Sequence, residues 1–315
     1  MTIAVVVPTN RPEQYQQFVR YWDPLFRLHD VDLFTVFDGD DPICKHGKKE
    51  VLLSERIQWA DLIYTHTDAV RNFGFLLALE TLGKDIEMIL TLDDDVYPIR
   101  GNDPIDDHLR ALDQRVPISW FSTADRYMRG FPYGVREEAE VWVSHGVWEG
   151  VHDYDGPTQL VLGNPPAKFY KGPIPKGALF PCCGMNLAWK LDATPWMYFA
   201  PMSKELGVQR FADIWMGIWM KQRLDVWNKA VVSGYSTVWH SRASNVLNNL
   251  EQEARGIKFN EELWRLDTQQ TSEEFQPYYL LWSKCLAKWT DTVNDLLSPS
   301  KKVETPEVKK GEVNE

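Results

Sequence analysis

The chain lacks the features that define several protein classes. It has only four cysteines in 315 residues, and their spacing matches no zinc-binding pattern. Cys182 and Cys183 are adjacent, which suits a routine disulfide bond poorly, so we expect all four thiols to be reduced. No apolar run is long enough to span a membrane, and no basic segment followed by an apolar stretch opens the chain. These absences favour a soluble, cytoplasmic protein.

Positive charge is also scarce. The chain has 34 Lys and Arg against 45 Asp and Glu, a net charge of −11, and no basic cluster precedes its last residues. Nucleic-acid-binding surfaces normally carry a basic stripe, so nucleic acid is not an expected partner. A Gly-x-Gly-x-x-Gly turn is missing after the first apolar segment, where Pro8-Thr9-Asn10 stands instead. The sequence therefore predicts that no flavin is bound.

Strand-like and helical segments alternate in the first third of the chain. Ile3–Val7 and Val31–Phe37 are β-branched runs typical of buried strands, and a helix is predicted between them over Glu13–Tyr21. A third strand is expected near Leu62–Thr65, followed by a helix over Asn72–Leu82. This βαβ order predicts a parallel sheet covered on both faces, whose ligands bind beyond the carboxyl ends of the strands.

The remainder of the chain is less regular. Residues 126–184 are rich in glycine, proline and aromatic side chains and are predicted to form loops around a site. Further strands and helices are expected at Asn186–Trp189, Arg210–Arg223, Val231–Val238, Ser244–Arg255 and Ser272–Leu297. Residues 298–315 contain little to bury, so we predict a single domain over residues 1–297 and a disordered tail.

The acidic triplet Asp93-Asp94-Asp95 is the most informative motif. It directly follows the apolar run Ile86–Leu92, where a strand is expected to end. Two carboxylates there can hold Mg²⁺ or Mn²⁺, which prefer oxygen ligands and keep positions open for a diphosphate. We expect Asp93 and Asp95 to bind the metal together with His240, which follows a predicted strand. The alternatives are a solvated acidic turn and a structural histidine.

Seven segments of the chain occur in one order that matches a known family. They are Leu92–Asp95, Met128–Glu137, Val143–Trp148, Asp153–Gln159, Ile174–Pro181, Cys183–Ala188 and Trp239–Asn245. In this order they closely resemble the reversibly glycosylated polypeptides, the UDP-arabinopyranose mutases, from the N-terminal strand to about Asn249. The resemblance implies a GT-A-like α/β domain with a mixed, mostly parallel central sheet flanked by helices. It also implies a UDP-sugar, a divalent metal (Mn²⁺ or Mg²⁺) and an arginine that is reversibly glycosylated.

The resemblance further implies roles for individual residues. Arg129 matches the family's glycosylated arginine, and Arg136 matches a second arginine that the family needs. Only Asp213 can inherit the family's acid/base role, because alanine replaces the neighbouring aspartate here. A guanidinium stays protonated near neutral pH, with a pKa above about 12, so a carboxylate must accept its proton. Our candidates, in order, are Asp155, Asp213 and Glu137.

Other polar residues are expected to contact the nucleotide sugar. A helix N-terminus with an arginine favours a diphosphate, and acceptors at the strand ends suit uracil or ribose. The predicted contacts are Pro8, Asn10, Asp38, Arg71, Asn72, Asp94 and Lys176.

Three functions remain open at this point. The first is a flavin-independent mutase that interconverts UDP-L-arabinopyranose and UDP-L-arabinofuranose, or a similar pair. The second is a GT-A glycosyltransferase with a UDP-sugar donor, and the third is a non-catalytic nucleotide-sugar-binding subunit. The two arginines Arg129 and Arg136 favour the first over the second, and the complete acidic triplet argues against the third. A homo-oligomer is compatible with each of them.

Overall fold

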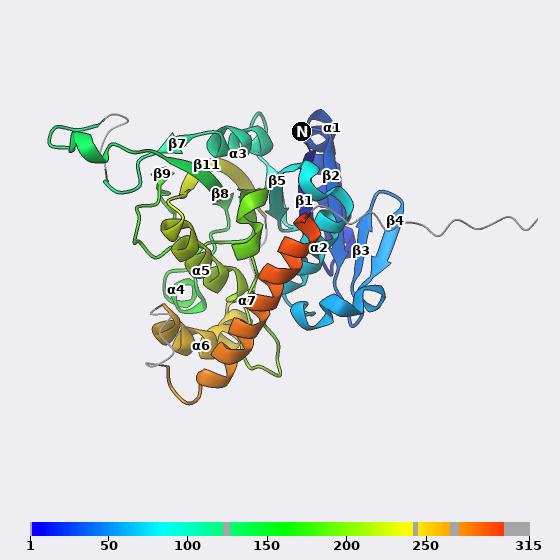
Figure 1. Ribbon diagram of the computed structural model, residues 1–315. Helices are drawn as coiled ribbons and strands as arrows, with labels where there is room; N and C mark the ends of the chain where they lie inside the picture. Colours follow the sequence, from blue (N-terminus) through cyan, green and yellow to red (C-terminus); the bar gives the residue numbers. More distant parts are fainter. Residues whose placement is uncertain (1, 122–126, 242–244, 265–270, 299–315) are drawn as a thin grey trace, which may run out of the picture.

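The computed structural model describes residues 2–121, 127–241, 245–264 and 271–298 (Figure 1). The predicted tail from residue 299 onward and residues 242–244 of the seventh family segment lie outside the described residues. The strands are β1 (Thr2–Thr9), β2 (Val31–Phe37), β3 (Ile43–His46), β4 (Lys49–Leu52), β5 (Ile86–Leu92), β6 (Val96–Pro98), β7 (Arg115–Val116), β8 (Ala139–Gly150), β9 (Gly172–Pro173), β10 (Asn186–Lys190) and β11 (Ala230–His240). The α-helices are α1 (Pro12–Leu28), α2 (Arg71–Leu82), α3 (Pro104–Leu112), α4 (Gly156–Leu162), α5 (Ala212–Val226), α6 (Val246–Leu263) and α7 (Gln276–Leu297).

One mixed sheet organises the molecule, in the order β4-β3-β2-β1-β5-β10-β8-β11-β6. Strands β1, β2 and β5 are parallel to one another. Strand β10 is antiparallel to both β5 and β8, so β8 runs in the same direction as β5, and β11 is parallel to β8. The five long strands therefore end at one edge of the sheet. The predicted mixed, mostly parallel central sheet flanked by helices is confirmed.

Helices cover both faces of the sheet. Side chains of α1 and α3, including Phe18, Trp22 and Ile105, pack in one hydrophobic core. Side chains of α2, α5, α6 and α7, including Phe73 and Trp215, pack in a second core on the other face (Figure 1). No helix in the described part of the chain is long and apolar enough to cross a membrane.

Helix α2 lies unusually close to the sheet. A Cβ atom on Gly74 would be 2.5 Å from Cγ1 of Val6 and 2.9 Å from Cγ2 of Val36. The helix is buried from Arg71 to Leu79, so its side chains are covered on all sides over this stretch. This close approach brings the first residue of α2, Arg71, to the edge where the parallel strands end.

Two predictions of secondary structure are wrong. Leu62–Thr65 is not a strand, because Leu62 ends a 3₁₀ helix (Leu53–Leu62) and the β3–β4 hairpin pairs with β2 instead. Residues 126–184 contain more than loops, because β8 is a 12-residue strand inside the sheet. Its apolar pattern is interrupted at Ser144 and His145, whose side chains are buried in hydrogen bonds with His108 and Ser233.

The remaining predicted elements are present, although several are longer than expected. Helix α1 continues to Leu28 because Trp22 and Phe26 remain buried against the sheet, and α6 continues to Leu263. All four cysteines are free, as predicted.

Candidate active site

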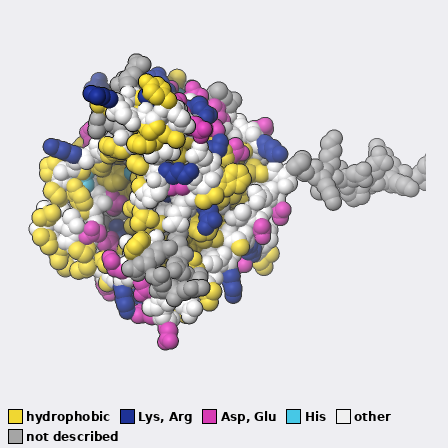
Figure 2. Space-filling model, turned by 60° about the vertical axis from the view of Figure 1, so that its left-hand side comes forward, with side chains coloured by type: hydrophobic (Ala, Val, Ile, Leu, Met, Phe, Trp, Pro, Cys, Tyr) yellow, Lys and Arg dark blue, Asp and Glu magenta, His cyan; other side chains and the backbone are white. Residues whose placement is uncertain are grey.

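A cleft of about 1760 Å³ opens at the carboxyl edge of the parallel strands. One wall comes from the residues that follow β1, β2 and β5 and from His240 at the end of β11. The opposite wall comes from the segment before α4, the start of α5, and α6. Among the described residues, the lining contains twelve Asp and Glu side chains but only four Lys and Arg. Acidic side chains accordingly gather around a hollow on the left of the face in Figure 2.

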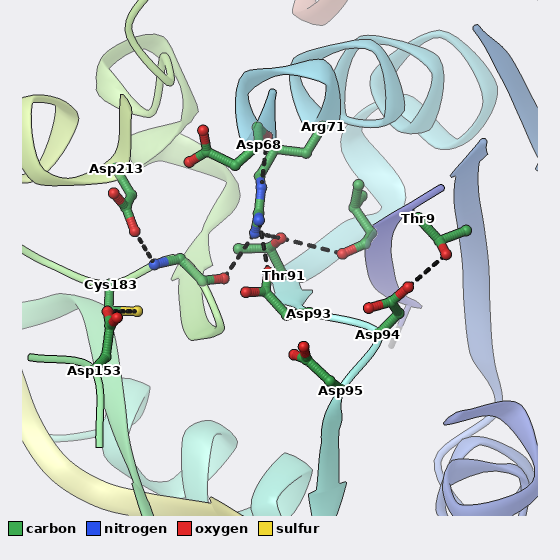
Figure 3. A network of polar contacts seen from close by, with 12 residues as sticks. Thr9, Asp68, Arg71, Thr91, Asp93, Asp94, Asp95, Asp153, Cys183 and Asp213 are labelled. Atoms are coloured by element: carbon green, nitrogen blue, oxygen red, sulfur yellow. Dashed lines mark hydrogen bonds and ion pairs between the residues drawn. The ribbon is translucent and has the colours of Figure 1, made fainter. Parts of the chain in front are cut away.

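The three carboxylates of the triplet have different partners (Figure 3). Asp94 is 1% exposed, accepts a hydrogen bond from Thr9 Oγ1 at 2.5 Å and forms an ion pair with Arg11. Burial raises the pKa of Asp94, and the contacts with Thr9 and Arg11 oppose the rise. Asp95 Oδ2 is 3.0 Å from Nη2 of the same arginine. The positively charged guanidinium of Arg11 therefore bridges the carboxylates of Asp94 and Asp95.

Asp95 and His240 form the part of the site best suited to a metal ion. His240 Nδ1 donates to the carbonyl of Val151 at 2.7 Å, which leaves the lone pair of Nε2 available. That nitrogen is 3.8 Å from Asp95 Oδ1. An imidazole nitrogen facing a carboxylate oxygen can hold a divalent cation, and this pair fits Mn²⁺ better than Mg²⁺, which prefers oxygen ligands alone. Among the described residues, no group of three His, Cys, Asp or Glu is already assembled as a metal site.

Arg71 binds Asp93, the remaining carboxylate of the triplet. Its Nη2 donates to Asp93 Oδ1 at 2.6 Å, and its Nη1 donates to Thr91 Oγ1 and to the carbonyl of Gly184. Its Nε donates to the carbonyl of Asp68, and the residue is only 2% exposed. These protein contacts occupy the guanidinium. Arg71 therefore positions the acidic loop, and its expected contact with the nucleotide sugar stays a prediction.

A second group of carboxylates lies on the other wall, around Asp213. Asp213 Oδ2 accepts a hydrogen bond from the backbone N–H of Gly184 at 2.9 Å. Burial and the nearby charges of Asp68 and Asp153 raise the pKa of Asp213 to about 7, and the Gly184 hydrogen bond opposes the rise. Burial also raises the pKa values of Asp68 and Asp153. A carboxyl group with a pKa near neutrality can both accept and donate a proton at physiological pH.

Most of the predicted site residues line this cleft. They are Pro8, Asn10, Asp38, Arg71, Asp93, Asp94, Asp95, Asp155, Asp213 and His240. Asp155 also caps α4, because its Oδ1 and Oδ2 accept hydrogen bonds from the backbone N–H and the hydroxyl of Thr158. Asp213 is consequently the better candidate for a proton acceptor.

Asn72 and Lys176 do not line the cleft, and their expected contacts with the nucleotide sugar stay predictions. Asn72 is fully buried, and its amide group bonds both the N–H and the carbonyl of Phe199. Lys176 is exposed, and its Nζ is 3.4 Å from Asn228 Oδ1, just beyond the end of α5.

Arg129 and Arg136 also lie outside the cleft, in a projecting segment of residues 127–138 that we call the arm. The arm follows β7 and leads into β8, and it extends from the left of the molecule in Figure 1. Arg129 is exposed. The guanidinium of Arg136 stacks on the rings of Tyr127 and Tyr133, at 4.9 and 3.7 Å, and donates to the carbonyl of Phe131. The structure thus does not bring either arginine to the cleft of its own chain.

Three site residues were missed from the sequence. Arg11 belongs to the same turn as Pro8 and Asn10, and its position after a buried strand was the available signal. Asp153 lies in the segment Asp153–Gln159, and Asp68 lies just before the helix that was predicted over Asn72–Leu82. Nothing local indicates that Asp68 and Asp153 would lie near Asp213.

Comparison with known proteins identifies the class of enzyme and the family to which this chain belongs. UDP-arabinopyranose mutase 1 of Oryza sativa subsp. japonica is 31% identical over 294 residues, 83% of this chain and 76% of that protein. UDP-arabinopyranose mutase 2 of Arabidopsis thaliana is 32% identical over 294 residues, which again cover 83% of this chain and 76% of that protein. These are names of intramolecular transferases, and the chain is an enzyme of this class. It belongs to the family described as reversibly glycosylated polypeptide, which matches residues 2–301 and confirms the resemblance carried by the seven segments.

Among solved structures, the chain is similar to a Drosophila β-1,4-galactosyltransferase 7, with a TM-score of 0.36 and 13% identity. The similarity covers 78% of each chain. The fold class rests on the strand order and directions described above rather than on this likeness.

Proposed function

We propose that this enzyme interconverts UDP-L-arabinopyranose and UDP-L-arabinofuranose, or a similar pyranose–furanose pair, without a flavin. The observation that carries the proposal is one cleft in which the Asp95–His240 donor pair lies together with Asp213, a carboxyl group whose pKa is about 7. The names of the relatives supply the substrate class.

The metal and nucleotide are assigned to the strand side of the cleft. Asp95 and His240 would hold a divalent ion, with Asp93 as the third protein ligand. A bound ion of this kind neutralises the diphosphate and makes UDP a better leaving group. Pro8, Asn10 and Asp38 lie at the ends of β1 and β2, where a nucleoside would sit beside the triplet.

The covalent step uses Arg129 as the nucleophile. A nitrogen of its guanidinium forms a bond to C1 of the sugar while the bond from C1 to the diphosphate oxygen breaks and its electron pair leaves with UDP. One guanidinium proton passes to the carboxylate of Asp213, so that the adduct keeps a single positive charge. Arg129 must meet the cleft for this step.

The ring change follows on the arginine adduct. The bond from C1 to the ring oxygen breaks and that oxygen takes the proton from Asp213, while the nitrogen on C1 passes its proton to the freed carboxylate, so that C1 becomes an imine on a guanidinium that keeps a single positive charge. A different hydroxyl then attacks C1, the imine nitrogen takes its proton back from Asp213, and the hydroxyl proton replaces it on that carboxylate. UDP displaces the arginine in the reverse of the first step, and the guanidinium regains its proton. A pKa near 7 suits Asp213 to these alternating roles.

The direct test is incubation of the purified protein with UDP-arabinofuranose and Mn²⁺, followed by chromatographic separation of the nucleotide sugars. We expect UDP-arabinopyranose to accumulate, and we expect Asp95→Asn to abolish the conversion. The matched control is Asp85→Asn, which removes an exposed carboxylate outside the cleft.

A radiolabelled UDP-sugar tests the covalent step separately. We expect label on Arg129 after peptide mapping by mass spectrometry, and neither label nor isomerisation in Arg129→Lys, which lacks the delocalised planar group. Label on another residue, or normal isomerisation by Arg129→Lys, would favour a glycosyltransferase with the same UDP-sugar site.

A further inference from the structure

The arm exposes an unusual amount of apolar surface. Met128, Tyr133 and Val135 are 48%, 85% and 43% exposed, although they lie within eight consecutive residues. Trp120 and Phe121, which precede the arm, are 43% and 64% exposed. Contiguous exposed apolar side chains of this kind mark surfaces that contact another molecule.

The arm is nevertheless a folded unit. Phe131 is only 7% exposed, and its ring centroid is 5.2 Å from that of Trp120 and 4.6 Å from that of Tyr127. Arg136 stacks on Tyr127 and Tyr133. Arg129, in contrast, forms no hydrogen bond or ion pair with any described residue. The internal contacts of the arm therefore present the guanidinium of Arg129 to an outside partner.

The attachment of the arm is remote from the cleft of the same chain. The arm leads into Ala139, the first residue of β8, whereas Gly150 at the end of β8 pairs with His240 in the cleft. Strand β8 has 12 residues and spans about 36 Å. Nine residues lie between Arg129 and Ala139, so the ten Cα–Cα steps that join them reach only about 35 Å even when fully extended. Arg129 could approach its own cleft only if the arm lost its folded form.

The tip of the arm is opposite in charge to the cleft. From Met128 to Arg136 the arm carries two arginines and no acidic residue, and its two glutamates, Glu137 and Glu138, lie at the junction with β8. The described lining of the cleft has twelve Asp and Glu against four Lys and Arg. Complementary charge favours the docking of one on the other and disfavours the docking of two clefts.

We infer that the arm of one copy docks on a second copy of this chain and delivers Arg129 to the cleft of that copy. This inference rests on the proposed function and adds that the reaction is shared between two chains. In the covalent step above, the guanidinium then comes from one chain, and the carboxylate of Asp213 comes from the other. A symmetric exchange of arms between two copies would complete both clefts.

Co-expression of two differently tagged variants tests the shared site. One copy carries Arg129→Lys and keeps an intact cleft, and the other carries Asp95→Asn and keeps Arg129. After purification through both tags and incubation with a radiolabelled UDP-sugar, we expect label on Arg129 of the Asp95→Asn copy. Each variant alone is expected to remain unlabelled. A doubly tagged complex without label, or failure to recover any such complex, would overturn the inference if the wild-type protein is labelled.

The oligomeric state tests docking without reference to catalysis. We expect the wild-type protein to be at least a dimer by light scattering. The double substitution Met128→Ser and Val135→Ser is expected to halve the mass, whereas Leu28→Ser with Val226→Ser, at positions 69% and 77% exposed elsewhere, should leave it unchanged. A monomeric wild-type protein would contradict the inference. An unlabelled wild-type protein that dimerises through the arm would contradict the covalent mechanism alone.

Discussion

The side chain of Arg11 competes with a metal ion for the carboxylate of Asp95. Its guanidinium contacts both Asp94 and Asp95 and is about one third exposed to the cleft, at 31%. An ion bound by Asp95 must compete with this contact, and the positive charge of Arg11 repels it. The guanidinium is then free to meet the diphosphate, for which its fork of donors is well suited.

We predict that Arg11→Gln binds Mn²⁺ more tightly in the absence of nucleotide. Loss of about 1 kcal/mol of competition and repulsion corresponds to roughly a fivefold lower dissociation constant. Calorimetric titration of the protein with Mn²⁺ measures this. Arg27→Gln is the control, because Arg27 pairs with Asp23 on the exposed face of α1. Weaker binding by Arg11→Gln would show that Arg11 supports the ion instead.

Asp213 sets the expected pH dependence of the reaction. Because its pKa is raised to about 7, the proportion of the carboxylate form increases as the pH rises through 7. We predict that the rate of arginine labelling increases over the same range and then levels off. Asp213→Asn should lose labelling at every pH, whereas Asp85→Asn should keep the wild-type profile. A wild-type profile that is flat from pH 5 to pH 9 would exclude Asp213 as the proton acceptor.

The same raised pKa predicts an opposite effect on stability. The folded protein holds the proton of Asp213 up to a higher pH than the unfolded chain does. The contribution of this group to stability is therefore complete below about pH 4 and declines as the pH rises through about 7. Asp213→Asn should be inactive but should lose less stability than the wild-type protein between pH 5 and pH 8, as measured by urea unfolding.

At the level of the elements, the contact of α2 with the sheet positions the acidic loop. Gly74 permits that contact because a Cβ would meet Val6 and Val36 at 2.5 and 2.9 Å. Arg71 lies one turn earlier on the same helix and holds Asp93 and the carbonyl of Gly184. A displacement of α2 would therefore move both walls of the cleft.

We predict that Gly74→Ala lowers the free energy of unfolding by about 1–3 kcal/mol, because the added methyl group overpacks the interface. Urea unfolding followed by tryptophan fluorescence measures the change. Gly39→Ala is the matched control, since a Cβ there would have no atom within 4 Å. Equal stability of the two variants would show that α2 can shift without cost.

At the level of the whole molecule, the cleft unites distant parts of the chain, so ligand binding should stabilise the fold. We predict that UDP and Mn²⁺ together raise the melting temperature by several degrees. A ligand at 100 times its dissociation constant contributes about 2.7 kcal/mol. Asp95→Asn should lose the effect, and GDP or ADP should produce a smaller one because the site is proposed to select uracil. An equal rise with GDP would contradict the assignment to UDP.

The sequence by itself determined the opening βαβ unit, the position of the acidic triplet and the family. These depend on local patterns: β-branched runs form buried strands, and long motifs in one order identify relatives. The antiparallel insertion of β10 between β5 and β8 depends on pairings between distant segments, as does the strand character of β8 itself.

Only the tertiary structure decided which charged residues meet. The pKa of Asp213 depends on burial and on Asp68 and Asp153, which are far away in the sequence. Arg11 enters the cleft while Lys176 and Arg129 do not, although all three are cations beside glycine, proline or polar residues in the sequence. Burial and the distance between charges are properties of the folded chain, so no local pattern can carry them.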